Sequence, residues 1–185
     1  MDKFHIYEEI SCPPSSSSQS TLSPSATTTS TSQVYKGRER STIQYVAIKR
    51  VDKSLIDLVS TSVGWMHRMS SPNVVRFVDW YETRNNLWII TEYCPGGALR
   101  RVLQDDKRLP ESSIRGFMVD IIRGLFHAHM TGVVLGCGIS PDGVLLDEFG
   151  VSKLNCFKHA SRRGGEGMGG KEEEVRLEER RQRAA

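Results

Sequence analysis

Residues 34–51, VYKGRERSTIQYVAIKRV, predict two strands joined by a polar loop at residues 38–42. Neighbouring side chains of a strand point to opposite faces, so Ala47 and Lys49 share one face, and the valine and isoleucine that precede them face the core. A small residue beside a lysine gives a flat apolar surface with one fixed cation. Such a surface suits a nucleotide, whose base lies on the apolar part while its phosphates reach the ammonium group. The alternative is a half-buried strand that ends in a solvated lysine.

The composition is that of an ordinary globular protein. The 185 residues, of which 38% are hydrophobic and 25% charged, suffice for one domain with a core. The net charge of +3 is too small to favour nucleic acid or an anionic membrane. No apolar run approaches the ~20 residues that span a bilayer, and the N-terminus lacks the apolar segment of a secretory signal. We therefore expect a cytoplasmic protein with neither a nucleic-acid nor a membrane partner.

The cysteines show neither a C-x-x-C spacing nor a pairing with histidine. This pattern favours reduced intracellular thiols over disulfides or metal ligands, and it predicts no metal site. The four residues concerned are Cys12, Cys94, Cys137 and Cys156.

A tract at residues 11–33 interrupts the N-terminal part of the chain. It contains ten Ser, five Thr and three Pro among 23 residues, and no Gly. Such a tract cannot bury enough apolar surface to offset the entropy of ordering, so we expect a disordered insertion. Its hydroxyl groups are either phosphorylation sites or part of a tolerated surface loop.

The rest of the chain divides into a strand-rich part and a mostly helical part. Residues 1–94 predict an α+β unit in which a five-stranded antiparallel sheet carries one helix on a face. Its strands are expected at 4–10, within 34–51, at 74–81 and at 87–93, and its helix at 54–69.

Residues 95–160 predict helices at 98–104 and 110–130, then short strands at 133–135, 144–146 and 151–154, the last two forming a hairpin. Residues 161–185 read as a flexible charged tail, with seven cations and six anions from Arg162 onward.

The order of these elements resembles a eukaryotic protein kinase domain. The segments VYKGRERSTIQYVAIKRVDKS, SPNVVRFVDWYETRNNLW, EYCPGGALRRVLQ and GVLLDEFG are similar to the Fused/unc-51-like family, in particular its plant microtubule-associated type. The similarity covers residues 1–10 and 34–160. It implies a kinase-like N-lobe followed by only the first, mostly helical part of the C-lobe, in a truncated and degenerate form.

The resemblance implies that ATP is the cofactor. Val34, Ala47 and Lys49 occupy the positions that cover the base and hold the phosphates. Thr91 occupies the gatekeeper position, and the backbone from Glu92 to Cys94 is placed to bond adenine. The alternative for that last segment is a strand end that turns into a helix.

The positions that handle charge in kinases depart from the family pattern. The resemblance puts Gly138 at the catalytic base, Ser140 at the catalytic-loop lysine and Gly143 at the metal-binding asparagine. The magnesium aspartate is replaced by Cys156, whose soft sulfur is poorly suited to Mg²⁺. No glycine loop precedes Val34. Mg²⁺ is therefore not expected, and catalytic residues are predicted to be absent.

Three functions remain open. The first is a pseudokinase that acts as a binding or scaffold module for a protein partner, which the resemblance links to microtubules, cytokinesis and the cytoskeleton. The second is an active ATP-dependent Ser/Thr protein kinase that uses a displaced carboxylate such as Asp142. The third is a non-functional kinase fragment whose long helix lacks half of its packing surface.

Overall fold

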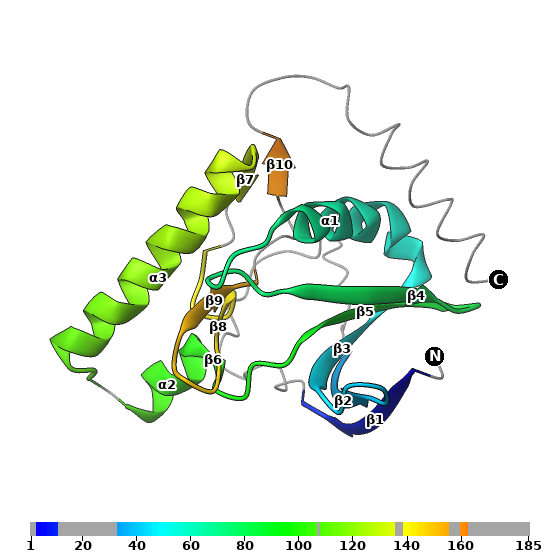
Figure 1. Cartoon of the computed structure of the whole chain (residues 1–185), viewed down its shortest axis with the longest axis horizontal. Helices are drawn as coiled ribbons and strands as arrows, with labels where there is room; N and C mark the ends of the chain where they lie inside the picture. Colours follow the sequence, from blue (N-terminus) through cyan, green and yellow to red (C-terminus); the bar gives the residue numbers. More distant parts are fainter. Residues whose placement is uncertain (1–2, 11–32, 107, 136–138, 156–159, 163–185) are drawn as a thin grey trace, which may run out of the picture.

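The computed structural model describes residues 3–10, 33–106, 108–135, 139–155 and 160–162, without the side chains of residues 57, 58 and 162. Figure 1 shows the sheet of β1 to β5 on one side of the molecule and α3 on the other, with the hairpin β8–β9 between them. The elements are β1 (Phe4–Glu9), β2 (Gln33–Glu39), β3 (Tyr45–Asp52), a 3-10 turn (Lys53–Leu55), α1 (Ile56–Arg68), β4 (Phe77–Glu82), β5 (Asn86–Glu92), β6 (Gly97–Ala98), α2 (Leu99–Asp105), α3 (Glu111–Met130), β7 (Val133–Leu135), β8 (Val144–Leu146), β9 (Ser152–Leu154) and β10 (Ala160–Arg162).

The N-terminal unit is an antiparallel sheet in the order β1-β2-β3-β5-β4. Helix α1 covers one face, where Val63 packs against Val51 and Ile89. The predicted α+β fold with five antiparallel strands and one helix is confirmed. Val46 and Ile48, expected in the core, are 3% and 1% exposed and pack on the other face of the sheet.

The strand predicted at residues 74–81 begins only at Phe77. Val74 instead forms a parallel bridge with Leu154, and the Val75 N–H donates to the Leu154 carbonyl at 3.0 Å. Both valines are fully buried. The prediction that these valines belong to the strand was wrong. A short buried apolar run has the same sequence pattern whether it pairs within the sheet or packs in the C-terminal core.

The C-terminal unit packs α3 against the sheet β6-β8-β9 and the pair β7-β10. The β8–β9 hairpin is confirmed, with Gly150 in the left-handed region at φ 78°. Strands β6 (Gly97–Ala98) and β10 (Ala160–Arg162) were not predicted, because they lack the run of large apolar residues that marks β7 and β8, and residues 161–162 were expected in the flexible tail. One side of α3 lies in the core, whereas each of these side chains on the other side is at least 40% exposed: Ile114, Met118, Val119, Ile122, Phe126 and Met130.

The loop between α1 and β4 joins the two units. The Leu154 N–H donates to the carbonyl of Asn73 at 2.9 Å, and the Asn73 side-chain amide donates to the Ser152 carbonyl at 3.2 Å. Asn73 is only 4% exposed. Helix α3 approaches the same point through Gly124, where a Cβ atom would lie 2.6 Å from the Asn73 carbonyl oxygen.

Two predicted segments fall largely outside the described residues. They are the Ser/Thr/Pro tract, of which only Gln33 is described, as the first residue of β2, and the charged tail beyond residue 162. Within the described part of the chain, no helix combines the length and the apolar content needed to cross a membrane.

Candidate functional site

Four of the residues predicted to bind a nucleotide lie on one face of the five-stranded sheet. The pairing of β2 with β3 sets Val34 opposite Lys49, and that of β3 with β5 sets Ala47 opposite Thr91. Directly paired residues share a face, as do residues two apart on one strand. Lys49 is exposed and the other three are half-buried. We call these four residues the candidate base face.

Ile10 extends the candidate base face, although the sequence did not predict this role. Its N–H donates to the Val34 carbonyl at 2.7 Å, and it continues the β1–β2 register that pairs Glu8 with Lys36. Ile10 therefore shares the face of Val34, and it is 37% exposed. Regular alternation would put Ile10 on the face of Phe4, but the register shift between Ile6 and Glu8 moves it to the face of Val34, so the sequence pattern did not indicate this role.

Leu145 presents a second apolar surface that the sequence analysis missed. It lies between Val144 and Leu146, which are 1% and 5% exposed in the C-terminal core, so its own side chain points to the opposite face of β8. Its cross-strand partners on that face are Ala98 and Lys153. Because the Lys153 ammonium reaches the end of β5, this face is turned toward the five-stranded sheet.

Residues 92–97, which we call the connector, run from β5 to β6. The Glu92 carboxylate accepts the Arg76 N–H at 2.8 Å and the Lys153 ammonium at 3.1 and 3.2 Å. The side chains of Lys153 and Glu92 are only 12% and 19% exposed. The sequence predicted a backbone role for Glu92, and the structure adds this part-buried ion pair with Lys153.

Cys94, the third residue of the connector, is buried at 7% exposure. Burial first, and then the negative charge of Glu92, raise the pKa of the Cys94 thiol from 9.0 to about 12. A thiol must lose its proton before it becomes a nucleophile, so the side chain acts as a small apolar group.

We expect Cys94 to resist alkylation by iodoacetamide at mildly alkaline pH in the folded protein and to react fully in denaturant. As the pH rises from 9.0 to about 12, only the unfolded state releases this proton, so the contribution of Cys94 to stability falls across that window. Peptide mass spectrometry of Cys94 measures the labelling. Similar native and denatured rates would contradict the prediction.

The segment at residues 140–143 forms a tight turn. The Gly143 N–H donates to the Ser140 carbonyl at 2.9 Å, and the Gly143 carbonyl accepts the Asn155 N–H at 2.8 Å. Gly143 has no side chain with which to bind a metal. The other two degenerate positions, Gly138 and Cys156, lie outside the described residues.

Asp142, the displaced carboxylate that an active kinase would use, binds an arginine side chain. Its carboxylate binds the Arg100 guanidinium of α2 at 2.5 Å, on the surface of the molecule. The displaced carboxylate that an active kinase would use is therefore already paired with a cation.

Comparison with known proteins decides the family. The sequence profile of the protein kinase domain matches residues 28–169. Serine/threonine-protein kinase RUNKEL of Arabidopsis thaliana is 40% identical over 160 residues, which cover 85% of this chain. Serine/threonine-protein kinase ULK4 of Mus musculus is 36% identical over 157 residues, again 85% of this chain. The chain belongs to the protein kinase domain family.

This kinase domain has an N-lobe, formed by the five-stranded sheet and α1, and only part of a C-lobe. The chain spans about a tenth of the two relatives, 10% of RUNKEL and 11% of ULK4. Protein kinase domains as a class bind ATP. Both relatives are named as serine/threonine-protein kinases, and this domain belongs to the same kinase family.

By the resemblance to kinases, Ser62 of α1 stands at the helix position where the family carries the glutamate that pairs with the strand lysine. Ser62 is half-buried on α1 and precedes Val63, which packs on the same sheet face that holds Lys49. Asp52, the carboxylate at the end of β3, caps the next turn, because it accepts the Ser54 N–H at 2.8 Å.

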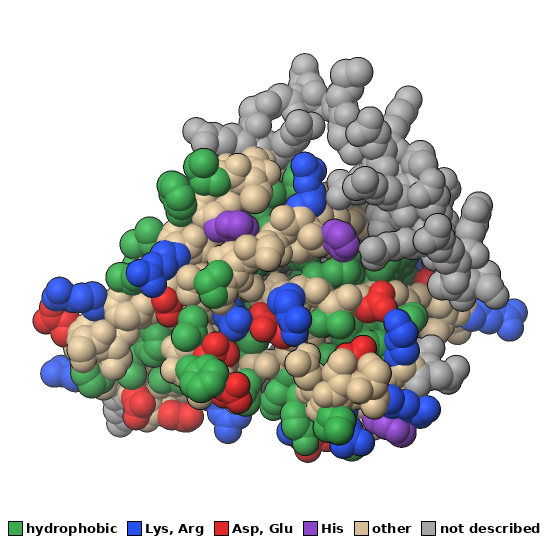
Figure 2. Space-filling view, in the orientation of Figure 1, with side chains coloured by type: hydrophobic (Ala, Val, Ile, Leu, Met, Phe, Trp, Pro, Cys, Tyr) green, Lys and Arg blue, Asp and Glu red, His purple; other side chains and the backbone are tan. Residues whose placement is uncertain are grey.

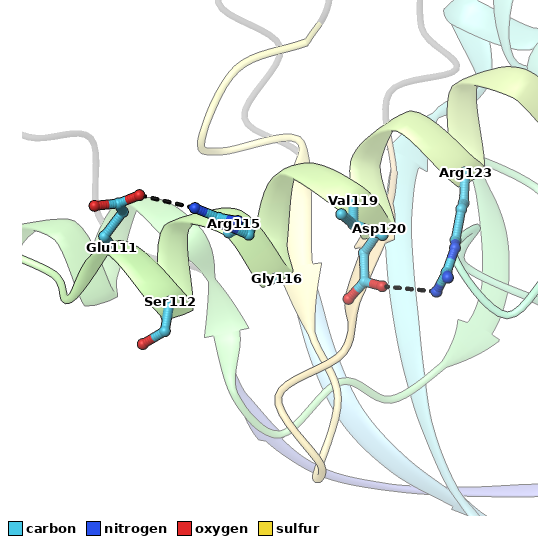
Figure 3. A pocket seen from close by; sticks show the side chains of 7 residues that line it. All are labelled: Glu111, Ser112, Arg115, Gly116, Val119, Asp120 and Arg123. Carbon is cyan, nitrogen blue, oxygen red and sulfur yellow. Dashed lines mark hydrogen bonds and ion pairs between the residues drawn. The ribbon is translucent and has the colours of Figure 1, made fainter.

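A shallow hollow of about 680 Å³ lies beside the N-terminal half of α3 in the C-lobe of the kinase domain. Figure 3 shows the ion pairs Glu111–Arg115 and Asp120–Arg123 along it. Hydrophobic side chains reach the surface along this helix in Figure 2. None of the predicted site residues lines the hollow, so it is separate from the candidate base face.

Proposed function

We propose that this kinase domain binds the base of a nucleotide, does not transfer phosphate, and acts as a binding or scaffold module for a protein partner. Segment 140–143 carries the proposal. A glycine stands at the metal-binding position, and the only carboxylate of the segment, that of Asp142, is engaged by Arg100. Phosphoryl transfer requires a positioned proton acceptor and metal ligands from the protein.

The residues present fit the adenine base of ATP better than its phosphates. Ile10, Val34 and Ala47 supply an apolar surface to one side of a base, and Leu145 and Ala98 supply another. Lys49 supplies one cation for the phosphates. The chain before Val34 contains no glycine loop whose backbone N–H groups could approach them. Binding of the nucleotide should therefore depend on the base and not on Mg²⁺.

A phosphotransfer assay with radiolabelled ATP tests the absence of catalysis. We expect the chain to transfer no more phosphate than its Lys49→Ala variant, because the general base, which contributes about 10²–10⁴-fold, is missing from the sequence. Activity that Lys49→Ala abolishes would contradict the proposal. It would favour an active Ser/Thr kinase, for which the intact strand lysine is the supporting observation.

Titration with a fluorescent ATP analogue, with Mg²⁺ and with a chelator, tests the nucleotide part separately. We expect dissociation constants that agree within about twofold, since metal contacts add nothing to a base contact. Binding only in the presence of Mg²⁺ would support the active kinase instead.

The resemblance to microtubule-associated plant kinases suggests the class of partner. We propose that the domain contributes to assembly on microtubules during cytokinesis, and co-sedimentation with polymerised tubulin tests this. The alternative of a non-functional fragment is favoured by the exposed side of α3, described above. A monodisperse sample that melts cooperatively would contradict that alternative.

A further inference from the structure

The connector is fixed at both ends by the β8–β9 hairpin. At one end Lys153 of β9 binds the Glu92 carboxylate. At the other, the Gly96 N–H donates to the Leu146 carbonyl of β8 at 3.0 Å, and a Cβ at Gly96 would lie 2.7 Å from the Leu146 Cβ. Residues 93–95 therefore lie between two residues, Glu92 and Gly96, that are both bonded to the β8–β9 hairpin.

The Glu92–Lys153 pair fixes the position of the connector more than it stabilises the fold. Both charges lose most of their hydration, and the mutual attraction of a buried pair often does no more than offset that loss. Its geometry is nevertheless highly specified. One carboxylate accepts a donor from the segment before β4, through Arg76, and a second donor from β9.

Lys153 also belongs to the surface expected beneath the base. It pairs across the strands with Leu145, which in turn pairs with Ala98, and the three share one face. A single side chain thus connects this apolar surface to the end of β5, where the connector begins.

We propose that Lys153 is a positioning residue for nucleotide recognition: through Glu92 it holds the connector backbone at a fixed height above Leu145 and so sets the gap that a base must fill. This inference rests on the nucleotide binding proposed above. In this proposal the preference for one base over another depends on Lys153, which does not contact the phosphates.

Binding of ATP and GTP analogues in chelator tests the role of Lys153. We expect Lys153→Met to weaken ATP binding by about tenfold or more, because loss of the ammonium group leaves the part-buried Glu92 carboxylate without its cation. The preference for one base over the other should fall at the same time, which general loosening of the fold would not produce. Lys153→Arg, which keeps the cation, should restore most of the preference.

The matched control is Lys53→Met, the same substitution in the exposed pair that Lys53 forms with Glu82. It should leave the affinity for ATP within about twofold of the wild type, since exposed pairs contribute little. If Lys153→Met does not fold, Glu92→Gln provides the second variant, because its amide oxygen still accepts the Arg76 N–H while the charge is lost. That variant should also lose base preference.

The outcomes separate the two proposals. Wild-type binding that neither Lys153→Met nor Glu92→Gln changes would overturn the role of Lys153 and leave nucleotide binding intact. A wild-type chain that binds no nucleotide would overturn both. Equal losses for Lys153→Met and Lys53→Met would overturn the positioning role, since any lost lysine would then have the same effect.

Discussion

Replacement of Leu154 by alanine should lower the free energy of unfolding by about 2–5 kcal/mol, the range for large-to-small changes in a closed core. Leu154 is fully buried in the C-terminal core, and its backbone bonds to both Asn73 and Val75. The substitution keeps those backbone bonds and removes only the side chain that fills the space below α3. Urea denaturation followed by circular dichroism gives the free energy.

Leu103→Ala is the matched control for this experiment. Leu103 lies on α2 with 44% of its surface exposed, so the same substitution removes far less buried area. We expect it to cost less than about 1 kcal/mol. Equal losses for the two variants would mean that the Leu154 side chain is not enclosed as described.

Two glycines of α3 should respond to alanine with opposite signs. A Cβ at Gly124 would lie 2.6 Å from the Asn73 carbonyl oxygen and 2.8 Å from the Leu154 Cδ1. Because one of these neighbours is backbone, the helix must move away, and overpacking of this kind costs about 1–3 kcal/mol. Gly124→Ala should therefore lower the melting temperature.

Gly116→Ala is expected to raise the melting temperature. No described atom lies within 4 Å of a Cβ at Gly116, so alanine meets no obstacle there. Alanine is favoured over glycine inside a helix by about 0.5–1 kcal/mol. Thermal melts of the two single variants side by side decide the matter, and a rise for both would show that α3 does not approach the Asn73 loop closely.

The sequence predicted the five-stranded sheet well because its central strands, β3 and β5, bury residues on one face. Alternation through Val46 and Ile48 reported that face directly, and the register then followed from the hairpins. The same alternation placed Ala47 and Lys49 together correctly. It failed for Val74 and Val75, since residues buried on all sides do not alternate.

The sequence could not predict contacts between distant segments. Glu92 and Lys153 are 61 positions apart, and no local sequence pattern around either residue predicts that they pair. Leu145 was readable in principle as the outward residue of VLL, but only the fold shows that its face turns toward the N-lobe. The turn at Gly143 and the Asp142–Arg100 pair likewise needed coordinates.

The two lobes touch through the connector, through the loop at Asn73 and through Met66 of α1, which packs in the same core as Ile121 and Leu154. Twisting or sliding of one lobe against the other would have to break the bonds between Leu154 and Asn73 or those at Glu92. Movement of one lobe away from the other would in addition expose Met66 and Leu154, so the interlobe core adds a hydrophobic cost to any separation of the lobes.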